Sequence, residues 1–272
     1  ALPISHFSEL ARECQLFVAF GGLPLRNAQV NGGGANDHML KYWLEKMQAQ
    51  GTRFINISPV RNDLSAVESA KWLAVRPGTD TALLLALCYV LIDESLYDSG
   101  FVASHTVGFA AYRAYLMGES DGVAKTPEWA AAITGIDAPQ IVALAREMAS
   151  KHTMVNISWS IQRARQGEQA YWATVALTAL LGQIGTPGGG LGFAYASTNL
   201  AGADRRTARR RPAAPVGRTT LTRLAGFARG TDMDFSEILN IGLMQGFAGL
   251  SLFAVLLLMG LGLAIIFGQM GV

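Results

Sequence analysis

Four short segments of the sequence combine residue types that recognise nucleotides, and each is expected to follow a buried strand. They lie at positions 21–26, 58–63, 76–80 and 159–163. Their guanidinium groups suit phosphate, their small residues allow close backbone approach, and their hydroxyl and carboxylate groups suit ribose and base edges. Because the carboxyl ends of parallel strands share one edge of a sheet, the four segments predict one crevice for a nucleotide-like ligand.

Each segment taken alone has a simpler explanation. Asp80 is placed to cap a helix, and Pro59 and Pro77 are ordinary turn residues. The sequence has no Gly-x-Ser-x-Gly elbow, no His-Glu-x-x-His motif and no Gly-Lys-Ser/Thr phosphate loop, so we predict no catalytic residue in it. Cys14 and Cys88 form no Cys-x-x-Cys pair, so we predict no metal ligand and expect two buried free thiols.

Alternating strands and helices must position these segments. Apolar runs that end at glycine, proline or serine predict buried strands at 15–20, 52–57, 71–75 and 153–157. Apolar residues at helical spacing predict helices at 39–51, 81–92 and 137–149, another that begins at Pro127, and mixed helix and loop at 96–115. The alternation predicts an α/β fold with a Rossmann-like, doubly wound parallel sheet.

The stretch 156–190 is the centre of this arrangement. It reads as a buried strand, a polar turn at 159–163, a helix that is apolar almost all round, and a stop at Pro187 followed by three glycines. A tight polar turn between a buried strand and a buried helix is where α/β proteins place ligand contacts. We therefore expect this turn to belong to the ligand site.

The composition divides the chain near residue 203. Half of all residues are hydrophobic and 15% are charged, and the net charge of +2 is uneven, because eight arginines but only four acids follow residue 203. The arginine-rich segment 204–236 has no apolar period, which predicts a disordered linker, with binding to nucleic acid or anionic lipid as alternatives. No signal sequence and no initiating methionine open the chain, so we expect Ala1 to lie inside a longer polypeptide.

The segment 237–272 has a different character. No charged residue occurs from 238 onward, and 247–267 is long enough to cross about 30 Å of hydrocarbon as a helix. Its many glycines suit close helix packing in a membrane. We therefore predict a transmembrane helix, against a buried core helix or a translation artefact. The predicted domains are 1–203, 204–236 and 237–272.

Several motifs in one order resemble a known family. They are Trp-Ser-Ile-Gln-Arg at 159–163 with Gly-Glu-Gln at 167–169, Gly-Gln-Ile-Gly-Thr-Pro-Gly-Gly-Gly at 182–190, Ile-Asn-Ile-Ser-Pro-Val-Arg at 55–61, Arg-Pro-Gly-Thr-Asp at 76–80, and the segments 118–122 and 125–130. Residues 1 to about 202 resemble the molybdopterin oxidoreductases of the dimethyl sulfoxide reductase family. The likeness is greatest to the branch that reduces dimethyl sulfoxide, trimethylamine N-oxide and biotin sulfoxide.

The resemblance implies a Rossmann-like domain that helps to hold a molybdenum bis(molybdopterin guanine dinucleotide) cofactor. It implies oxygen-atom transfer from a small S-oxide or N-oxide, with electrons from an unidentified donor, and chemistry that belongs to the metal. The residues implied at the guanosine end are Ser58, Pro59, Pro77 and Asp80, with Arg61 in the same loop. Those implied at the dinucleotide or pterin are Trp159, Ser160, Gln162 and Arg163.

The sequence also departs from the family pattern. An aspartate commonly stands at the position of Ser58, so one charged hydrogen bond to the nucleotide is weakened or replaced here. Leu23 likewise stands where asparagine often precedes the proline. The segment with the serine ligand to molybdenum is expected before Ala1, and the closing C-terminal domain is expected after Gly202. We therefore expect the chain to be a fragment that is inactive alone.

The residues 241–268 carry a second resemblance, to the first transmembrane helix of urea or branched-chain amino-acid transporter permeases. This leaves two alternative functions: a membrane permease fragment of an ABC transporter, or a nucleotide-binding module without catalysis. A truncated or rearranged reading frame would explain the unusual junction. The enzyme part is expected in the periplasm or the cytoplasm and the last helix in a membrane. No nucleic-acid partner is expected for the enzyme.

Overall fold

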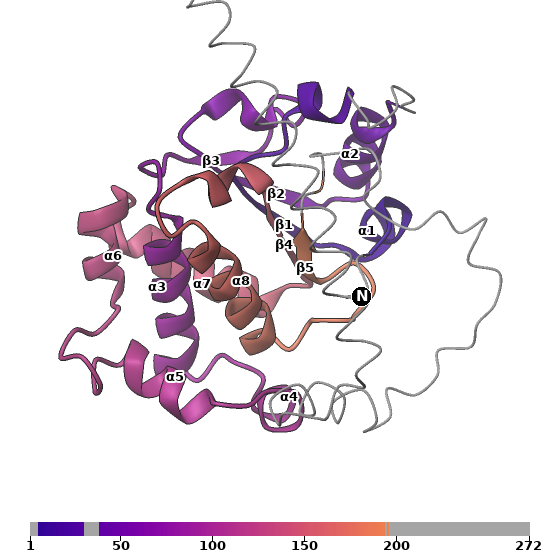
Figure 1. Cartoon of the computed structure of the whole chain (residues 1–272). Helices are drawn as coiled ribbons and strands as arrows, with labels where there is room; N and C mark the ends of the chain where they lie inside the picture. Colours follow the sequence, from indigo (N-terminus) through magenta and orange to yellow (C-terminus); the bar gives the residue numbers. More distant parts are fainter. Residues whose placement is uncertain (1–4, 30–37, 194, 196–272) are drawn as a thin grey trace, which may run out of the picture. The chain divides into compact units, whose positions relative to one another are not determined.

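A five-stranded sheet organises the part of the chain that the computed structural model describes, residues 5–29, 38–193 and 195 (Figure 1). Its strands are β1 (Leu16–Phe20), β2 (Arg53–Ile57), β3 (Lys71–Leu73), β4 (Thr153–Ile157) and β5 (Gly190–Phe193), in the order β3-β2-β1-β4-β5. All four neighbouring pairs are parallel. Phe20 at the end of β1 lies opposite Ile57 and Ile157, so the three central strands end at the same level.

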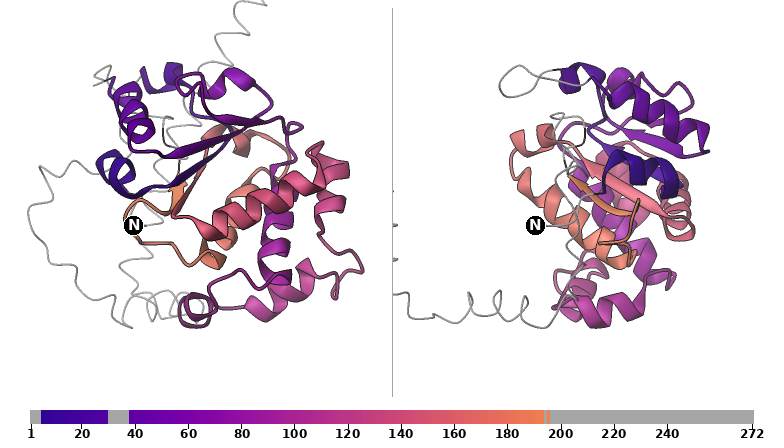
Figure 2. Two further views of the ribbon diagram at one scale, coloured as in Figure 1. Left: turned by 180° about the vertical axis from the view of Figure 1, so that it is seen from behind. Right: turned by 90° about the vertical axis from the view of Figure 1, so that its right-hand side faces the viewer.

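Helices cover both faces of this sheet (Figures 1 and 2). The α-helices of the described residues are α1 (Phe7–Glu13), α2 (Leu40–Ala49), α3 (Asp80–Asp93), α4 (Ser99–His105), α5 (Phe109–Leu116), α6 (Pro127–Thr134), α7 (Ala138–Ser150) and α8 (Glu168–Leu180). The same part of the chain contains three short 3-10 helices, η1 (Leu25–Gln29), η2 (Arg61–Leu64) and η3 (Trp159–Arg163). Helices α1 and α2 lie on one face, and α3, α7 and α8 lie on the other.

The side chains of β1 show why the strand has no polar side. Leu16, Val18 and Phe20 join one hydrophobic cluster with α3, α7 and α8. Phe17 and Ala19 point the other way, into the cluster with α1 and α2. Because successive side chains of a strand alternate between faces, a strand covered on both faces must be a continuous apolar run.

Helix α3 has more buried residues than any other helix in the described part of the chain. Ten of its residues are buried, and its apolar residues face α6, α7 and α8 at once. Its first turn differs from the sequence prediction in one respect. The N-cap is Thr79, whose hydroxyl donates to the Arg76 carbonyl over 2.7 Å, and Asp80 is the first helical residue. The prediction that Asp80 caps this helix is therefore wrong, and its carboxylate is available for another role.

The mixed α/β fold with a parallel sheet is confirmed, and β1, β2 and β4 begin within one residue of their predicted positions. The predicted helix start at Pro127 is also confirmed, with Thr126 accepting a hydrogen bond from the Trp129 amide. The sequence interpretation missed α1 and β5, and both cysteines are buried free thiols as expected.

The predictions for the C-terminal part stay predictions. The arginine-rich linker at 204–236 and the apolar helix at 237–272 lie outside the described residues. Within the described ranges, no helix is both long enough and apolar enough to span a bilayer.

Candidate functional site

Hydrogen bonds join the loops at the carboxyl edge of the sheet. The Gly21 amide donates to the Ile57 carbonyl over 2.8 Å, and the Ser158 amide donates to the Phe20 carbonyl over 2.9 Å. Gly21 has φ +77°, and a Cβ atom on it would lie 2.8 Å from Ser158 Cβ. Glycine at this position therefore lets the loops after β1 and β4 approach each other closely.

The loop after β2 is held from inside by polar contacts. Ser58 is buried, and its hydroxyl donates to Asp63 Oδ2 over 2.7 Å. The carbonyl of Ser58 accepts a hydrogen bond of 2.8 Å from the Trp72 indole of β3. Pro59 and Arg61 are exposed at the surface of the same loop. This loop therefore presents a buried serine at its base and a proline and an arginine to solvent.

The loop after β4 forms η3, and the first residues of α8 hold it in place. Ser158 accepts a hydrogen bond from the Ser160 amide, and its carbonyl accepts one of 2.8 Å from the Tyr171 hydroxyl. Trp159 is 43% exposed, and its ring centroid lies 5.9 Å from that of Phe193. The predicted residues Ser160, Gln162 and Arg163 are also exposed. Their side chains are free of the protein core, as ligand contacts must be.

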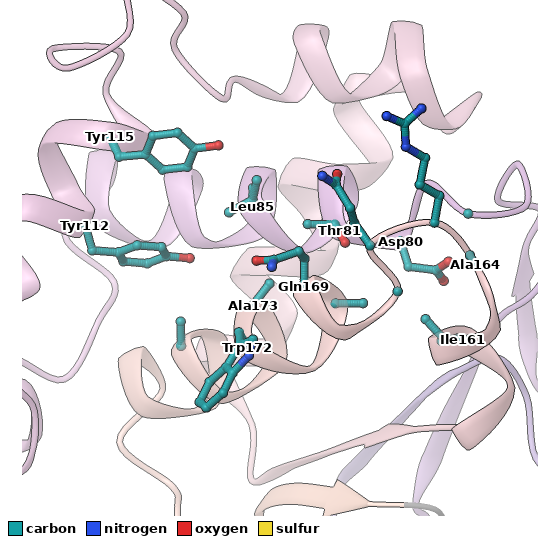
Figure 3. Close-up of a pocket in the computed structure, with 16 residues that line it drawn as sticks. Asp80, Thr81, Leu85, Tyr112, Tyr115, Ile161, Ala164, Gln169, Trp172 and Ala173 are labelled. Carbon is teal, nitrogen blue, oxygen red and sulfur yellow. The ribbon is translucent and has the colours of Figure 1, made fainter. Parts of the chain in front are cut away.

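A cavity of about 700 Å³ lies beside these loops, between α3, α5 and the segment from η3 to α8 (Figure 3). Figure 3 shows Tyr112 and Tyr115 entering it from α5, while Trp172 and Gln169 enter from α8. The size is in the range of small-molecule sites. The lining residues are Gly78, Asp80, Thr81, Leu85, Tyr112, Tyr115, Ile161, Ala164, Arg165, Gln166, Gly167, Gln169, Ala170, Trp172, Ala173 and Ala176.

Asp80 gives this cavity its electrostatic character. The residue is only 7% exposed, and burial raises the pKa of its carboxyl above the ordinary value, although a hydrogen bond from its own backbone amide partly opposes the change. A buried carboxylate is costly unless donors reach it. A ligand with N–H groups in the cavity would supply such donors, and Arg165 at the margin supplies a positive charge.

The structure brings some of the predicted residues together and separates others. Asp80 lines the cavity together with Gly78 of the same predicted segment and Ile161 of η3. Arg61 lines a different cavity of about 270 Å³, with Asn56 and Trp72 among its walls. The arginine therefore does not share the pocket of Asp80.

Sequence reasoning missed the aromatic wall of the cavity. Tyr112 and Tyr115 lie in the region expected only as mixed helix and loop, and nothing in their spacing distinguishes them from core residues. Burial raises the pKa of the Tyr112 hydroxyl, with the nearby Cys88 as a further cause. Trp172 is 70% exposed on a helix predicted to be apolar almost all round. A large exposed aromatic residue on a buried helix is a signal that only the structure makes visible.

The level strand ends and the close glycine turn belong to an α/β domain with a parallel sheet, and a buried carboxylate lines a cavity beside them. The chain belongs to the molybdopterin oxidoreductase family, whose model matches residues 11–260. The match continues through the arginine-rich segment, and the comparisons give no support to the transporter resemblance of the C-terminal residues. Membership of this family implies a molybdenum–pterin cofactor.

The curated relatives of this chain include several named S-oxide or N-oxide reductases. A biotin sulfoxide reductase of Cereibacter sphaeroides is 43% identical over 194 residues, which cover 71% of this chain and 26% of that protein. A dimethyl sulfoxide/trimethylamine N-oxide reductase of Rhodobacter capsulatus is 41% identical, with 68% and 22% covered. A trimethylamine-N-oxide reductase of Haemophilus influenzae is 36% identical, with 71% and 23% covered. The chain thus spans about a quarter of the length of these enzymes.

A solved structure with a similar domain belongs to an enzyme with a different name. Acetylene hydratase from Pelobacter acetylenicus matches with a TM-score of 0.52 and 26% identity, over 66% of this chain and 22% of that one. Its name describes a hydration and not the reduction of an oxide. A domain of this kind therefore does not define the reaction by itself, and the reaction must be argued from the nearer relatives.

Proposed function

We propose that this chain is the nucleotide-binding part of a reductase that uses molybdenum bis(molybdopterin guanine dinucleotide) to reduce S-oxides or N-oxides. The observation that carries the proposal is the buried Asp80 carboxylate in a cavity of about 700 Å³. Guanine presents an N–H and an amino group on one edge, and both can donate to a carboxylate. Adenine presents an acceptor nitrogen on the corresponding edge, which a carboxylate repels.

The strand order supports the finer prediction of a Rossmann-like, doubly wound sheet. In such folds the strand order reverses beside the first strand, and ligands bind at that point of the carboxyl edge. Here β2 and β4 flank β1, and the segments after all three strands are joined by hydrogen bonds. This arrangement would present backbone amides and small residues to a dinucleotide.

The proposed contacts follow the position of each residue. Asp80 would accept from the guanine edge, and Ser58 and Arg61 belong to the loop that would face the guanosine and its phosphates. The exposed η3 residues would contact the dinucleotide or the pterin. The full set proposed for the cofactor is Ser58, Pro59, Arg61, Pro77, Asp80, Trp159, Ser160, Gln162 and Arg163.

The metal and the protein residues would have different roles. When bound, the molybdenum centre would supply the oxygen-atom transfer and the passage of two electrons. The residues of this chain would bind and orient the carrier of the metal, and those around Asp80 would exclude water from the base. The electrons would come from a separate donor.

The proposed domains of the chain have the boundaries predicted from the sequence. Residues 1–203 would form the cofactor-binding α/β domain, 204–236 the linker and 237–272 an apolar helix. Because the chain spans about a quarter of its relatives, turnover would need the remaining segments of a complete reductase. The small oxide substrate would meet the complete enzyme and not this domain alone.

A nucleotide series tests the proposal directly. The full chain is titrated calorimetrically with GDP, IDP and ADP. GDP should bind most tightly, IDP more weakly because it lacks the 2-amino donor, and ADP weakest because its ring nitrogen faces the carboxylate. Since a hydrogen bond to a charged group contributes about 1.5–3 kcal/mol, GDP and ADP should differ by roughly tenfold or more. Equal affinities, or no binding of GDP, would refute the guanine assignment.

A further inference from the structure

One carboxylate holds together the two loops at the β1–β2 side of the edge. Asp63, in η2, receives a hydrogen bond of 2.7 Å from the Ser58 hydroxyl and one of 3.0 Å from Arg26 Nη2. Its carbonyl accepts the Leu23 amide over 2.6 Å. The loop after β1 and the loop after β2 therefore meet at a single residue.

The packing around Asp63 leaves little freedom. Its side chain is 14% exposed, whereas that of Arg26 is 67% exposed. Gly22 has φ +73°, and a Cβ atom on it would lie 2.4 Å from Asp63 Cβ. The backbone of the first loop thus lies directly against Asp63, so a shift of this residue would change its contact with Gly22.

We infer that Asp63 is a positioning residue for the nucleotide-binding edge, and this inference rests on the proposed function. Its two carboxylate oxygens accept from two donors in different loops at once, Ser58 on one side and Arg26 on the other. The buried Ser58 hydroxyl is committed to this bond, so it orients the loop and leaves the exposed Pro59 and Arg61 to face a ligand.

A carboxylate suits this position because its two oxygens accept from both donors at once. Asparagine has one acceptor oxygen and one donor amide, so it can satisfy Arg26 or the Ser58 hydroxyl, but not both. Its amide could donate to Ser58 Oγ, which has a second lone pair beside the one that accepts the Val60 amide over 3.2 Å, but the Ser58 hydroxyl would then lose its own acceptor and Arg26 would lose its charged partner. Asp63→Asn therefore preserves size and loosens one of the two loops.

A matched set of variants tests the inference by calorimetric titration of the full chain with GDP, at a temperature where all variants are folded. Asp63→Asn should bind GDP about tenfold more weakly than the unmodified chain. Ser58→Ala should weaken binding by a smaller factor. In the double variant the loss of affinity should be smaller than the sum of the two single losses, because each substitution removes the Ser58–Asp63 hydrogen bond. Asp93→Asn, an equal charge change at the exposed end of α3, should leave the affinity unchanged.

A second readout separates positioning from a purely structural role. Amide hydrogen exchange at Gly21 and Leu23 should be faster in Asp63→Asn, while exchange in β4 stays unchanged. Loss of stability with unaltered GDP affinity and unaltered exchange in the glycine turn would show a structural role and overturn the inference. If the unmodified chain binds GDP and Asp63→Asn binds within twofold of it, the inference alone fails. If the unmodified chain does not bind GDP, the proposed function fails, and the inference falls with it.

Discussion

The substitution Asp80→Asn should preserve or raise the stability of the fold and weaken the binding of the ligand. Burial raises the pKa of this carboxyl above its ordinary value of 3.8, so the charged form is disfavoured in the folded protein. Asparagine keeps the size and removes the charge. At neutral pH the variant should therefore be at least as stable as the unmodified chain, although the residue is only 7% exposed. Most substitutions of buried residues destabilise, so this direction is diagnostic.

The pH dependence gives the sign of the effect. A raised pKa means that the folded protein holds the proton more tightly than the unfolded chain does. Stability therefore falls as pH rises through the window between the ordinary value of 3.8 and the higher value in the fold. Asp80→Asn removes this contribution, so its advantage should be present at pH 7 and should disappear as the pH approaches 3.8.

Ligand binding should change in the opposite direction. The carboxylate can accept two hydrogen bonds from a guanine edge. The asparagine side chain offers only one acceptor oxygen, and its NH2 group would face one of the N–H donors of guanine. Loss of a hydrogen bond to a charged group costs about 1.5–3 kcal/mol, which corresponds to a GDP affinity lower by roughly 10- to 150-fold. Calorimetric titration at pH 7 measures the affinity, and urea denaturation from pH 4 to pH 7 measures the stability.

A control on the same helix makes the test specific. Asp93→Asn changes the charge equally at the exposed end of α3, away from the cavity, and should leave GDP affinity unaltered. If Asp80→Asn binds GDP as tightly as the unmodified chain, the base does not contact this carboxylate. If it is clearly less stable at pH 7, the carboxylate is stabilised by a donor within the protein, and the argument from desolvation is wrong.

Three further results are expected. Gly22→Ala should lower the free energy of unfolding by about 1–3 kcal/mol in urea titrations, because φ is +73° and the new Cβ would lie 2.4 Å from Asp63 Cβ; an unchanged midpoint would contradict this. Leu87→Ala, in the buried face of α3, should cost about 2–5 kcal/mol in the same assay, and Val107→Ala, on the exposed surface, close to nothing. Because burial raises the pKa of both Cys14 and Cys88 to about 12, neither should react with a disulfide reagent at pH 8 until the chain unfolds, and rapid labelling of the native protein would refute the burial.

The parts of the fold that follow from local pattern could be predicted from the sequence. Strand β4 begins and ends where its apolar run does, and Pro127 begins α6 because proline suits the first helical turn. Strand β5 could not be predicted in this way. It contains two glycines, and its place beside β4 depends on a tertiary contact in which Gly190 lies opposite Met154.

The candidate site shows the same division. The loops at the carboxyl edge were predictable because each follows an apolar run and carries its own turn residues. The aromatic wall was not, because Tyr112 and Trp172 are far apart in sequence and meet only when α5 and α8 pack on α3. The role of Asp63 was hidden for a related reason. The aspartate is visible in the sequence, but its partner Arg26 is 37 residues away, across the glycine turn.

The loops at the carboxyl edge of the sheet are joined by two different kinds of contact. On one side, the backbone of Gly21 lies close to Ser158, and the Ser158 amide donates to the Phe20 carbonyl, so among the described residues the loops of β1 and β4 meet without a side-chain hydrogen bond between them. On the other side, the loops of β1 and β2 are joined by side chains that meet at Asp63. A change at Asp63 should therefore disturb the loop of Ser58 while the loop of η3 keeps its position. In the proposed site, this would weaken the guanosine contacts selectively, and the contacts expected from Trp159 and Gln162 would persist.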